Sequence, residues 1–113
     1  MMRAMEDVVA EYSRVGTRSD FWLNLGALLT DEVVIVEAQA AGMDWPDLAD
    51  GRRRLVNTRR AIIGVALRRG WIGTQESWLL MGADPQEVLA AARPWIEREQ
   101  RRQLGETESP EGR

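Results

Sequence analysis

The sequence predicts an all-α protein, a compact bundle of five to six helices with a helix-turn-helix-like unit near its C-terminus. Apolar residues recur at helical spacing, residues typical of helix starts and ends separate the segments, and no segment offers a partner for a β-strand. With 113 residues, 44% hydrophobic and 29% charged, the chain has the composition of one globular domain. We expect that domain at residues 1–104 and a disordered C-terminal tail at 105–113, which is polar and contains Gly and Pro.

The first two helices are expected at residues 2–15 and 19–40. In both, apolar residues recur at intervals of three and four, and a glycine follows the last of them. Ser19 or Asp20 is the expected cap of the second helix. Residues 33–36 are all β-branched and therefore also have strand propensity. Because no other segment offers a partner strand, we favour the helix.

A third helix is expected from Asp44, as its cap, to Arg69, with Pro46 in its first turn. A glycine follows its last residue. Thr74 is the expected cap of a short fourth helix, which runs to Met81 and is again followed by a glycine. These two glycines mark the ends of the two helices.

The sequence Asp-Pro-Gln-Glu at 84–87 predicts the start of another helix. It places a capping residue first, proline at the first helical position and glutamate at the third. Pro94 lies about ten residues further on, so the helix either bends there or restarts as a final helix that ends at Leu104.

The side chains that are absent exclude several function classes. The chain has 18 acidic and 15 basic residues, a net charge of -3, and every basic residue is arginine. Histidine, lysine and cysteine are all absent. The chain therefore lacks an imidazole base, a thiolate nucleophile, a Schiff-base lysine and the usual ligands of zinc, haem and iron–sulfur clusters. We expect a binding protein that is not an enzyme, with no catalytic residue, no metal and no cofactor.

Neither a membrane span nor a signal peptide is expected. The longest apolar stretch, residues 21–29, is far shorter than the about 20 residues that cross a bilayer. Glu6 and Asp7 lie where a signal peptide would be apolar. Because the chain also has no cysteine for disulfides, we expect a cytoplasmic protein without a membrane partner.

Residues 74–93 follow a more specific pattern. A short helix ends at Gly82, which lies between Met81 and Ala83, and the β-branched Val88 stands six positions after the glycine. This pattern resembles the helix-turn-helix of bacterial and phage DNA-binding proteins, and with the preceding helix it is loosely similar to Trp-repressor-like domains. The resemblance implies a regulator of transcription whose second helix reads DNA bases.

Arginines on the third helix form the second notable pattern. At about 100° per residue, Arg52 and Arg59 lie within about 20° of each other, and so do Arg53 and Arg60. The line through Arg52 and Arg59 is close to the centre of the apolar face of the helix. A guanidinium on an apolar face requires a carboxylate partner or an anionic ligand.

The functional interpretation of this pattern is a face that binds nucleic acid. Arginine forks match phosphate, so we expect these four arginines, together with Arg68 and Arg69, to contact phosphates. On the helix that starts at residue 85, Gln86 and Arg93 are the residues able to reach base edges. The alternative interpretation is that the arginines pair with carboxylates of the second helix, namely Asp31, Glu32 or Glu37.

Contact with another protein is the alternative function. Trp78 stands four positions before the turn glycine, where helix-turn-helix proteins normally have a small residue. The chain would then be a helical adaptor or inhibitor, as small accessory and phage-encoded proteins often are, with Trp78, Leu89 and Trp95 in its interface. For the nucleic-acid function we expect a homodimer through the second helix, whose apolar spacing is similar to that of a coiled coil.

The distribution of the arginines distinguishes these two functions. One continuous arginine face that includes the start of the helix at residue 85 favours nucleic acid. Arginines that are scattered and individually paired with carboxylates favour a protein partner.

Overall fold

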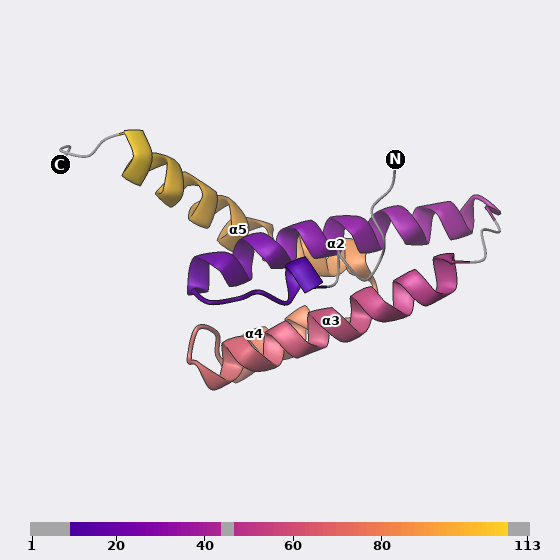
Figure 1. Ribbon diagram of the computed structural model, residues 1–113, viewed down its shortest axis with the longest axis horizontal. Helices are drawn as coiled ribbons and strands as arrows, with labels where there is room; N and C mark the ends of the chain where they lie inside the picture. The colour runs from indigo at the N-terminus through magenta and orange to yellow at the C-terminus, as the bar shows by residue number, and fades with distance from the viewer. Residues whose placement is uncertain (1–9, 44–46, 109–113) are drawn as a thin grey trace.

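Helices make up most of the protein (Figure 1). The computed structural model describes residues 10–43 and 47–108. A helical turn at 10–12 precedes α2 (Arg18–Ala40), α3 (Leu48–Arg68), α4 (Thr74–Leu80) and α5 (Pro85–Glu108). No strand occurs in the described residues, which confirms the predicted all-α class. Most of the expected first helix, at 2–15, lies outside them.

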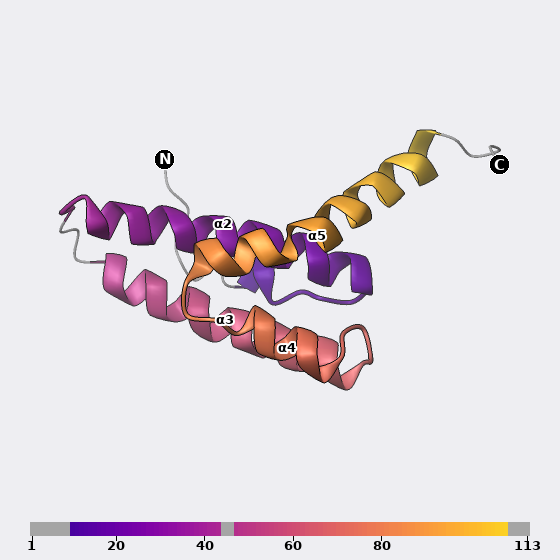
Figure 2. The same cartoon turned by 180° about the vertical axis from the view of Figure 1, so that it is seen from behind.

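The central helix is α2. It packs against α3 and against α5. The short α4 packs against α3 and α5 on the side of the protein that faces the viewer in Figure 2. Because two helices cover α2, its buried side chains face more than one direction. The large apolar ones are Phe21, Trp22, Leu25, Leu28 and Leu29. Residues 33–36 belong to the same helix, which confirms the helical prediction for this run.

A capping box fixes the start of α2. The Thr17 hydroxyl accepts a hydrogen bond from the Asp20 backbone N–H at 3.0 Å, and the Asp20 carboxylate accepts one from the Thr17 N–H at 3.2 Å. The N-cap is therefore Thr17, and the prediction that Ser19 or Asp20 caps the helix is wrong. Asp20 lies at the third helical position, and its carboxylate accepts the reciprocal hydrogen bond of the capping box.

In the described part of the chain, α3 begins at Leu48. Asp44 and Pro46, where its start was expected, lie outside the described residues. The helix ends at Arg68, one residue before the predicted end. Gly70 follows with a φ of 75°, a left-handed conformation that glycine adopts without steric cost.

The helix α4 begins at Thr74. The sequence predicted Thr74 as the cap of this helix, but Thr74 is its first helical residue. Gly73 occupies the cap position, and its N–H donates to the Glu76 carboxylate at 2.8 Å. After α4 the chain turns at Gly82, where a Cβ would lie 3.0 Å from Cγ2 of Val88. Val88 therefore packs against the turn at the predicted offset, and glycine provides the space that this contact needs.

The last helix, α5, continues through Pro94 and bends part-way along its length (Figure 2). A proline inside a helix removes one backbone donor and clashes with the preceding turn, which accounts for a bend. At the start of α5 the Asp84 carboxylate accepts a hydrogen bond from the Gln86 N–H at 3.0 Å, in agreement with the predicted cap. Residues 105–108 are helical and do not belong to the disordered tail predicted from residue 105.

A polar cluster joins the second half of α5 to the start of α2. The buried Glu99 carboxylate accepts hydrogen bonds from the Ser19 hydroxyl and from the Arg102 guanidinium, whose Nη2 lies 2.5 Å from it. Burial by itself would raise the pKa of Glu99. The hydrogen bonds from Ser19 and Arg102, with the charges of Arg102 and Arg18, outweigh burial and lower the pKa below its ordinary value of 4.5.

This lowered pKa predicts a pH-dependent contribution of Glu99 to stability. The contribution is present above the ordinary pKa of 4.5 and is lost as the pH falls below it, through the lower pKa of the folded state. We expect Glu99→Gln to reduce the free energy of unfolding at neutral pH, and the difference from wild type to shrink as the pH falls. Urea denaturation across this pH range measures the difference. The control is Glu97→Gln, and an equal pH dependence in both variants would contradict the prediction.

Candidate functional site

Arg59 is buried in the core and is not available to a phosphate. Its side chain is 2% exposed, and its Nε and Nη2 donate to the two carboxylate oxygens of Glu32 at 2.7 and 3.1 Å. The prediction that Arg59 contacts nucleic acid is therefore wrong. The physical reason is its place on the apolar face of α3, where a charge must be paired to be buried. Of the carboxylates considered as partners, Glu32 is the one that occupies this position.

The same guanidinium also holds α4. Nη1 of Arg59 donates to the backbone carbonyl of Leu80 at 2.6 Å. Through its three hydrogen bonds Arg59 joins α2, α3 and α4, so the planar fork of arginine serves here as an internal connector. This hydrogen bond adds to the packing of α4 against α3 and α5.

Arg52, Arg53 and Arg60 remain on the surface, around a hollow of about 380 Å³ between α2 and α3. Arg52 Nη1 donates to Oε1 of Gln39 at 3.2 Å, and Arg53 pairs with Asp50. Within the described residues, no hydrogen bond or ion pair engages the guanidinium of Arg60. The lining residues are Gln39, Ala49, Arg52, Arg53, Val56, Asn57 and Arg60.

Arg68 and Arg69 lie at the exposed C-terminal end of α3. The Arg69 guanidinium lies over the ring of Trp71, 5.5 Å from its centroid, which is a cation–π contact. Cations at a helix C-terminus also interact favourably with the helix dipole. Intramolecular contacts are therefore sufficient to account for these two arginines.

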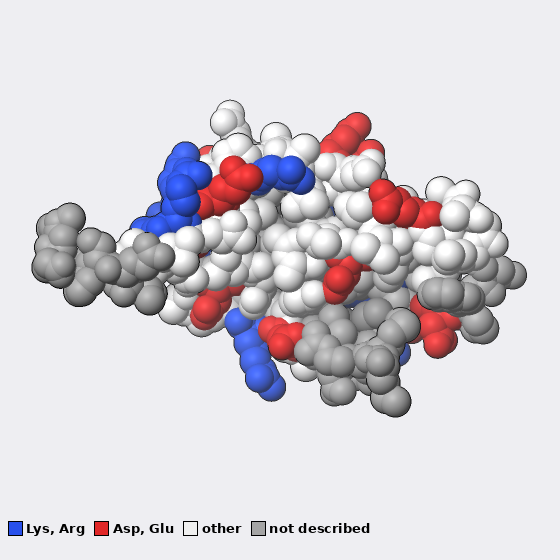
Figure 3. Space-filling model, turned by 90° about the horizontal axis from the view of Figure 1, so that it is seen from above, with Lys and Arg blue, Asp and Glu red and all other residues white. Residues whose placement is uncertain are grey.

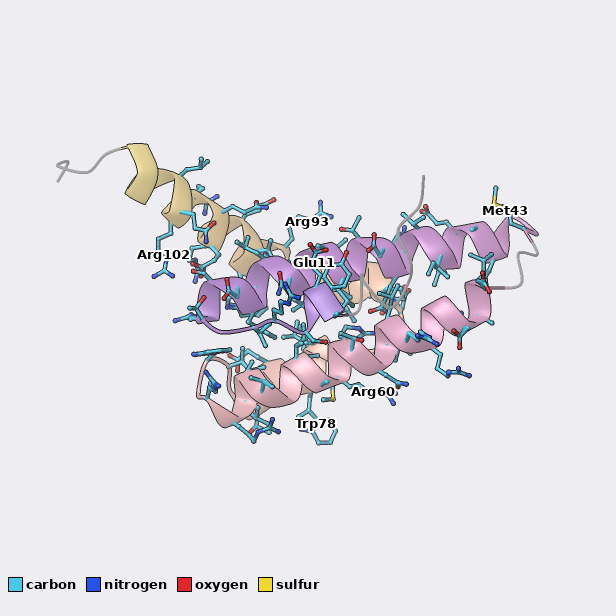
Figure 4. The ribbon with its side chains drawn as sticks, in the orientation of Figure 1. Glu11, Met43, Arg60, Trp78, Arg93 and Arg102 are labelled. Carbon is cyan, nitrogen blue, oxygen red and sulfur yellow. The ribbon has the colours of Figure 1, made fainter. Side chains whose placement is uncertain are left out.

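Gln86 and Arg93 lie on α5, apart from the hollow of α3. The Gln86 side-chain amide is 3.5 Å from the carboxylate of Glu37 on α2. Arg93 lines a second hollow, of about 400 Å³, between α2 and α5. Figure 4 shows Arg93 and Arg60 projecting from opposite edges of the protein. The predicted phosphate-contacting and base-contacting residues therefore do not form one face.

The charged side chains on the face seen in Figure 3 are of mixed sign. Arginines gather near the C-terminal end of α5, acidic side chains lie among and beyond them, and most of this face is uncharged. Elsewhere, individual arginines are paired with carboxylates, as in Arg53 and Arg54 with Asp50. The arginines are therefore scattered, and some of them are paired with carboxylates while others, such as Arg60, have no carboxylate partner in the described part of the chain.

Leu89 and Trp95 contribute to internal packing. The ring of Trp95 stacks on that of Trp22, with centroids 5.4 Å apart and an angle of 20° between the planes. Leu89 is partly buried against the core and lines the hollow between α2 and α5. Neither side chain is exposed in the way that the predicted interface required.

Trp78 is the most exposed large apolar side chain among the described residues, with 78% of its surface accessible. Its ring projects clear of the ribbon (Figure 4). Leu79 and Met81, one and three residues after Trp78 in the sequence, are 48% and 43% exposed. We refer to Trp78, Leu79 and Met81 as the Trp78 patch. The sequence points to Trp78 but not to Leu79 or Met81, because the apolar side chains of a seven-residue helix point in several directions.

The first part of the apolar stripe of α2, where a homodimer interface was expected, lies inside the protein. Trp22, Leu25 and Leu29 on this stripe are at most 2% exposed, because α3 and α5 cover them. Further along the stripe, Val33 and Val36 are half-buried and Ala40 is exposed, so self-association through this part of α2 stays a prediction.

Comparisons with known proteins identify no relative. The chain matches no protein-family model, no curated protein and no solved structure. Within residues 10–43 and 47–108, no helix is long and apolar enough to span a bilayer. In the same residues no three metal-ligating side chains come together as a metal site.

Proposed function

We propose that the protein is a helical adaptor or inhibitor that binds another protein through the Trp78 patch. The observation that supports this proposal is the 78% exposure of Trp78 next to two further exposed apolar side chains. Tryptophan is enriched among the residues that dominate the energy of protein interfaces. A group of exposed apolar side chains on a soluble surface commonly marks an interaction site.

The patch is held in place before any partner binds. Leu80 and Ser77, on the opposite side of α4, are buried, and the Leu80 carbonyl accepts the hydrogen bond from Arg59. Glu76 caps the helix at Gly73. Because α4 is fixed at both ends, binding through Trp78 costs little conformational entropy of the backbone, and this favours affinity.

The chemistry of the patch indicates the kind of partner. An indole with two aliphatic neighbours fits an apolar pocket or groove on the partner. The indole N–H is a hydrogen-bond donor, so a carbonyl or carboxylate at the rim of that pocket would pair with it.

Nucleic-acid binding by a helix-turn-helix-like unit, the other function predicted from the sequence, has less support. Arg59 is buried, and Arg53 and Arg69 are engaged within the chain. At the start of α5, where a recognition helix would approach DNA, Glu87 is exposed and would repel phosphates. The α4–turn–α5 unit is better suited to presenting Trp78 than to reading bases.

We expect Trp78→Ala to weaken binding of the protein partner by at least about 2 kcal/mol, or about thirtyfold in Kd. Affinity capture with the tagged full-length protein, followed by mass spectrometry, identifies the partner. Calorimetry with the purified partner then measures the loss. Because Trp78 is exposed, the free energy of unfolding should change by no more than about 0.5 kcal/mol.

The matched control is Val34→Ala, which removes an apolar side chain that is 58% exposed on α2, away from the patch. The proposal expects this variant to retain the partner with wild-type affinity. If Trp78→Ala retains it equally well, or if the protein captures DNA instead, the Trp78 patch is not the functional surface.

A further inference from the structure

The hollow between α2 and α3 collects positive charge on a protein whose net charge is -3. Among the described residues, its lining contains three arginines and two side-chain amides, and no carboxylate. Asp50 pairs with Arg53 and Arg54 from outside the lining. Arg53 is therefore neutralised from outside the hollow, whereas Arg52 and Arg60 have no carboxylate partner among the described residues.

The arginines are spaced along the hollow and do not cluster at one point. Arg53 and Arg60 are seven residues apart, which places them about 10.5 Å apart along the helix axis and within about 20° around it. Arg52 is turned toward α2 by its hydrogen bond to Gln39. An anion in the hollow would meet Arg52 and Arg53 at one end and Arg60 at the other.

The arginines at the two ends of the hollow differ in whether another side chain holds them in position. The guanidinium of Arg52 is already positioned by Gln39, whereas Arg60 projects from α3 and is not engaged by any residue in the described part of the chain (Figure 4). Asn57 lies between the two ends and offers a neutral donor, and Val56 adds apolar surface. This arrangement holds one end of a ligand and lets Arg60 close on the other.

We propose that this hollow binds a ligand with two phosphate groups. Guanidinium groups bind phosphate through paired hydrogen bonds, and arginines at both ends suit two phosphates better than one. The volume of about 380 Å³ is at the lower end of the range of about 300–1,000 Å³ for small-ligand pockets. The proposal does not depend on the Trp78 patch and is tested separately from it.

Titration of the full-length protein with inorganic pyrophosphate, followed by NMR of backbone amides, tests the proposal. We expect saturable shifts centred on residues that line the hollow, and an affinity at least about tenfold weaker in Arg60→Ala. The matched control is Arg54→Ala. Arg54 has the same charge and lies on the same helix, but it pairs with Asp50 at 2.8 Å and does not line the hollow. Equal weakening in both variants would show unspecific attraction and overturn the proposal.

A second titration, with a single-stranded oligonucleotide, distinguishes the source of the phosphates. If the oligonucleotide binds more tightly than pyrophosphate, and Arg60→Ala but not Arg54→Ala weakens it, the two phosphates belong to a nucleic-acid backbone. If pyrophosphate alone binds in this way, the ligand is a small diphosphate. Absence of saturable binding by both probes at about 50 mM salt would rule the site out.

Discussion

Replacement of Arg59 by alanine is expected to lower the free energy of unfolding by about 3–5 kcal/mol. The substitution leaves the Glu32 carboxylate, 1% exposed, without its partner, and it leaves the Leu80 carbonyl without its donor. Both losses occur in the core, where water cannot replace the missing hydrogen bonds. A change of this size is a large fraction of the about 5–15 kcal/mol that stabilises a typical domain.

Chemical denaturation of wild type and Arg59→Ala measures this effect. The matched control is Arg60→Ala, which removes the same side chain one residue further along α3, at an exposed position, and should change stability by no more than about 0.5 kcal/mol. A loss below about 1 kcal/mol in Arg59→Ala would mean that the buried pair is not important for the fold. Hydrogen exchange should also show faster opening of α4 in this variant, because Arg59 holds Leu80.

A double replacement separates the effect of the buried ion pair on stability from the effect of the hydrogen bond between Arg59 and Leu80. In Glu32→Leu with Arg59→Met the core contains no charge at this place, and buried ion pairs replaced by apolar side chains of similar volume are often neutral or stabilising. The Leu80 carbonyl still lacks a donor, which costs about 1–3 kcal/mol. We therefore expect the double variant to recover most of the stability lost in Arg59→Ala, while α4 stays less protected from hydrogen exchange.

The same pair shows how far the sequence predicts the site. Helical spacing places Arg59 on the apolar face of α3, so the need for a partner can be derived from the sequence alone. The sequence alone does not identify Glu32 as the partner in preference to Asp31 or Glu37, because that choice depends on how α2 is rotated against α3. Arg52 illustrates the same limit, since it lies on the same line of α3 as the buried Arg59 and is nevertheless exposed.

The predicted helix boundaries differ from the structure for a local reason. Thr17, Ser19 and Asp20 are all residues that favour the N-cap position, and only the reciprocal hydrogen bonds between Thr17 and Asp20 identify the cap. At α4 the cap is a glycine, whose role depends on the Glu76 side chain three residues later. Where one residue type was decisive, as with Asp84 before Pro85, the predicted start is confirmed.

The exposure of the Trp78 patch could not be predicted from spacing, because α4 has only seven residues and its sequence contains apolar side chains in several directions. Packing on α3 and α5 buries Ser77 and Leu80 and leaves Trp78 facing solvent. The decisive information is therefore tertiary: which side of α4 the buried Arg59 holds against the protein.

Two adjacent leucines on α4 offer the most direct test of this arrangement. Leu80 is 0% exposed, whereas Leu79 is 48% exposed in the Trp78 patch. We expect Leu80→Ala to reduce the free energy of unfolding by about 2–5 kcal/mol, because it leaves a cavity in the core. Leu79→Ala should change it by no more than about 0.5 kcal/mol. Denaturation curves of the two variants, measured side by side, give both values.

At a temperature where both variants are folded, we expect Leu79→Ala to weaken binding to the protein partner more than Leu80→Ala does, which is the opposite of their order in stability. Leu79→Ala removes part of the patch and is expected to weaken binding directly, by about 1 kcal/mol or more, with no change in stability. Leu80→Ala leaves every side chain of the patch in place, so any loss of affinity arises from a less rigid α4 and should be smaller in the folded protein. If Leu80→Ala weakens binding more than Leu79→Ala while it remains folded, the fixed position of α4 contributes more to binding than the apolar contact of Leu79.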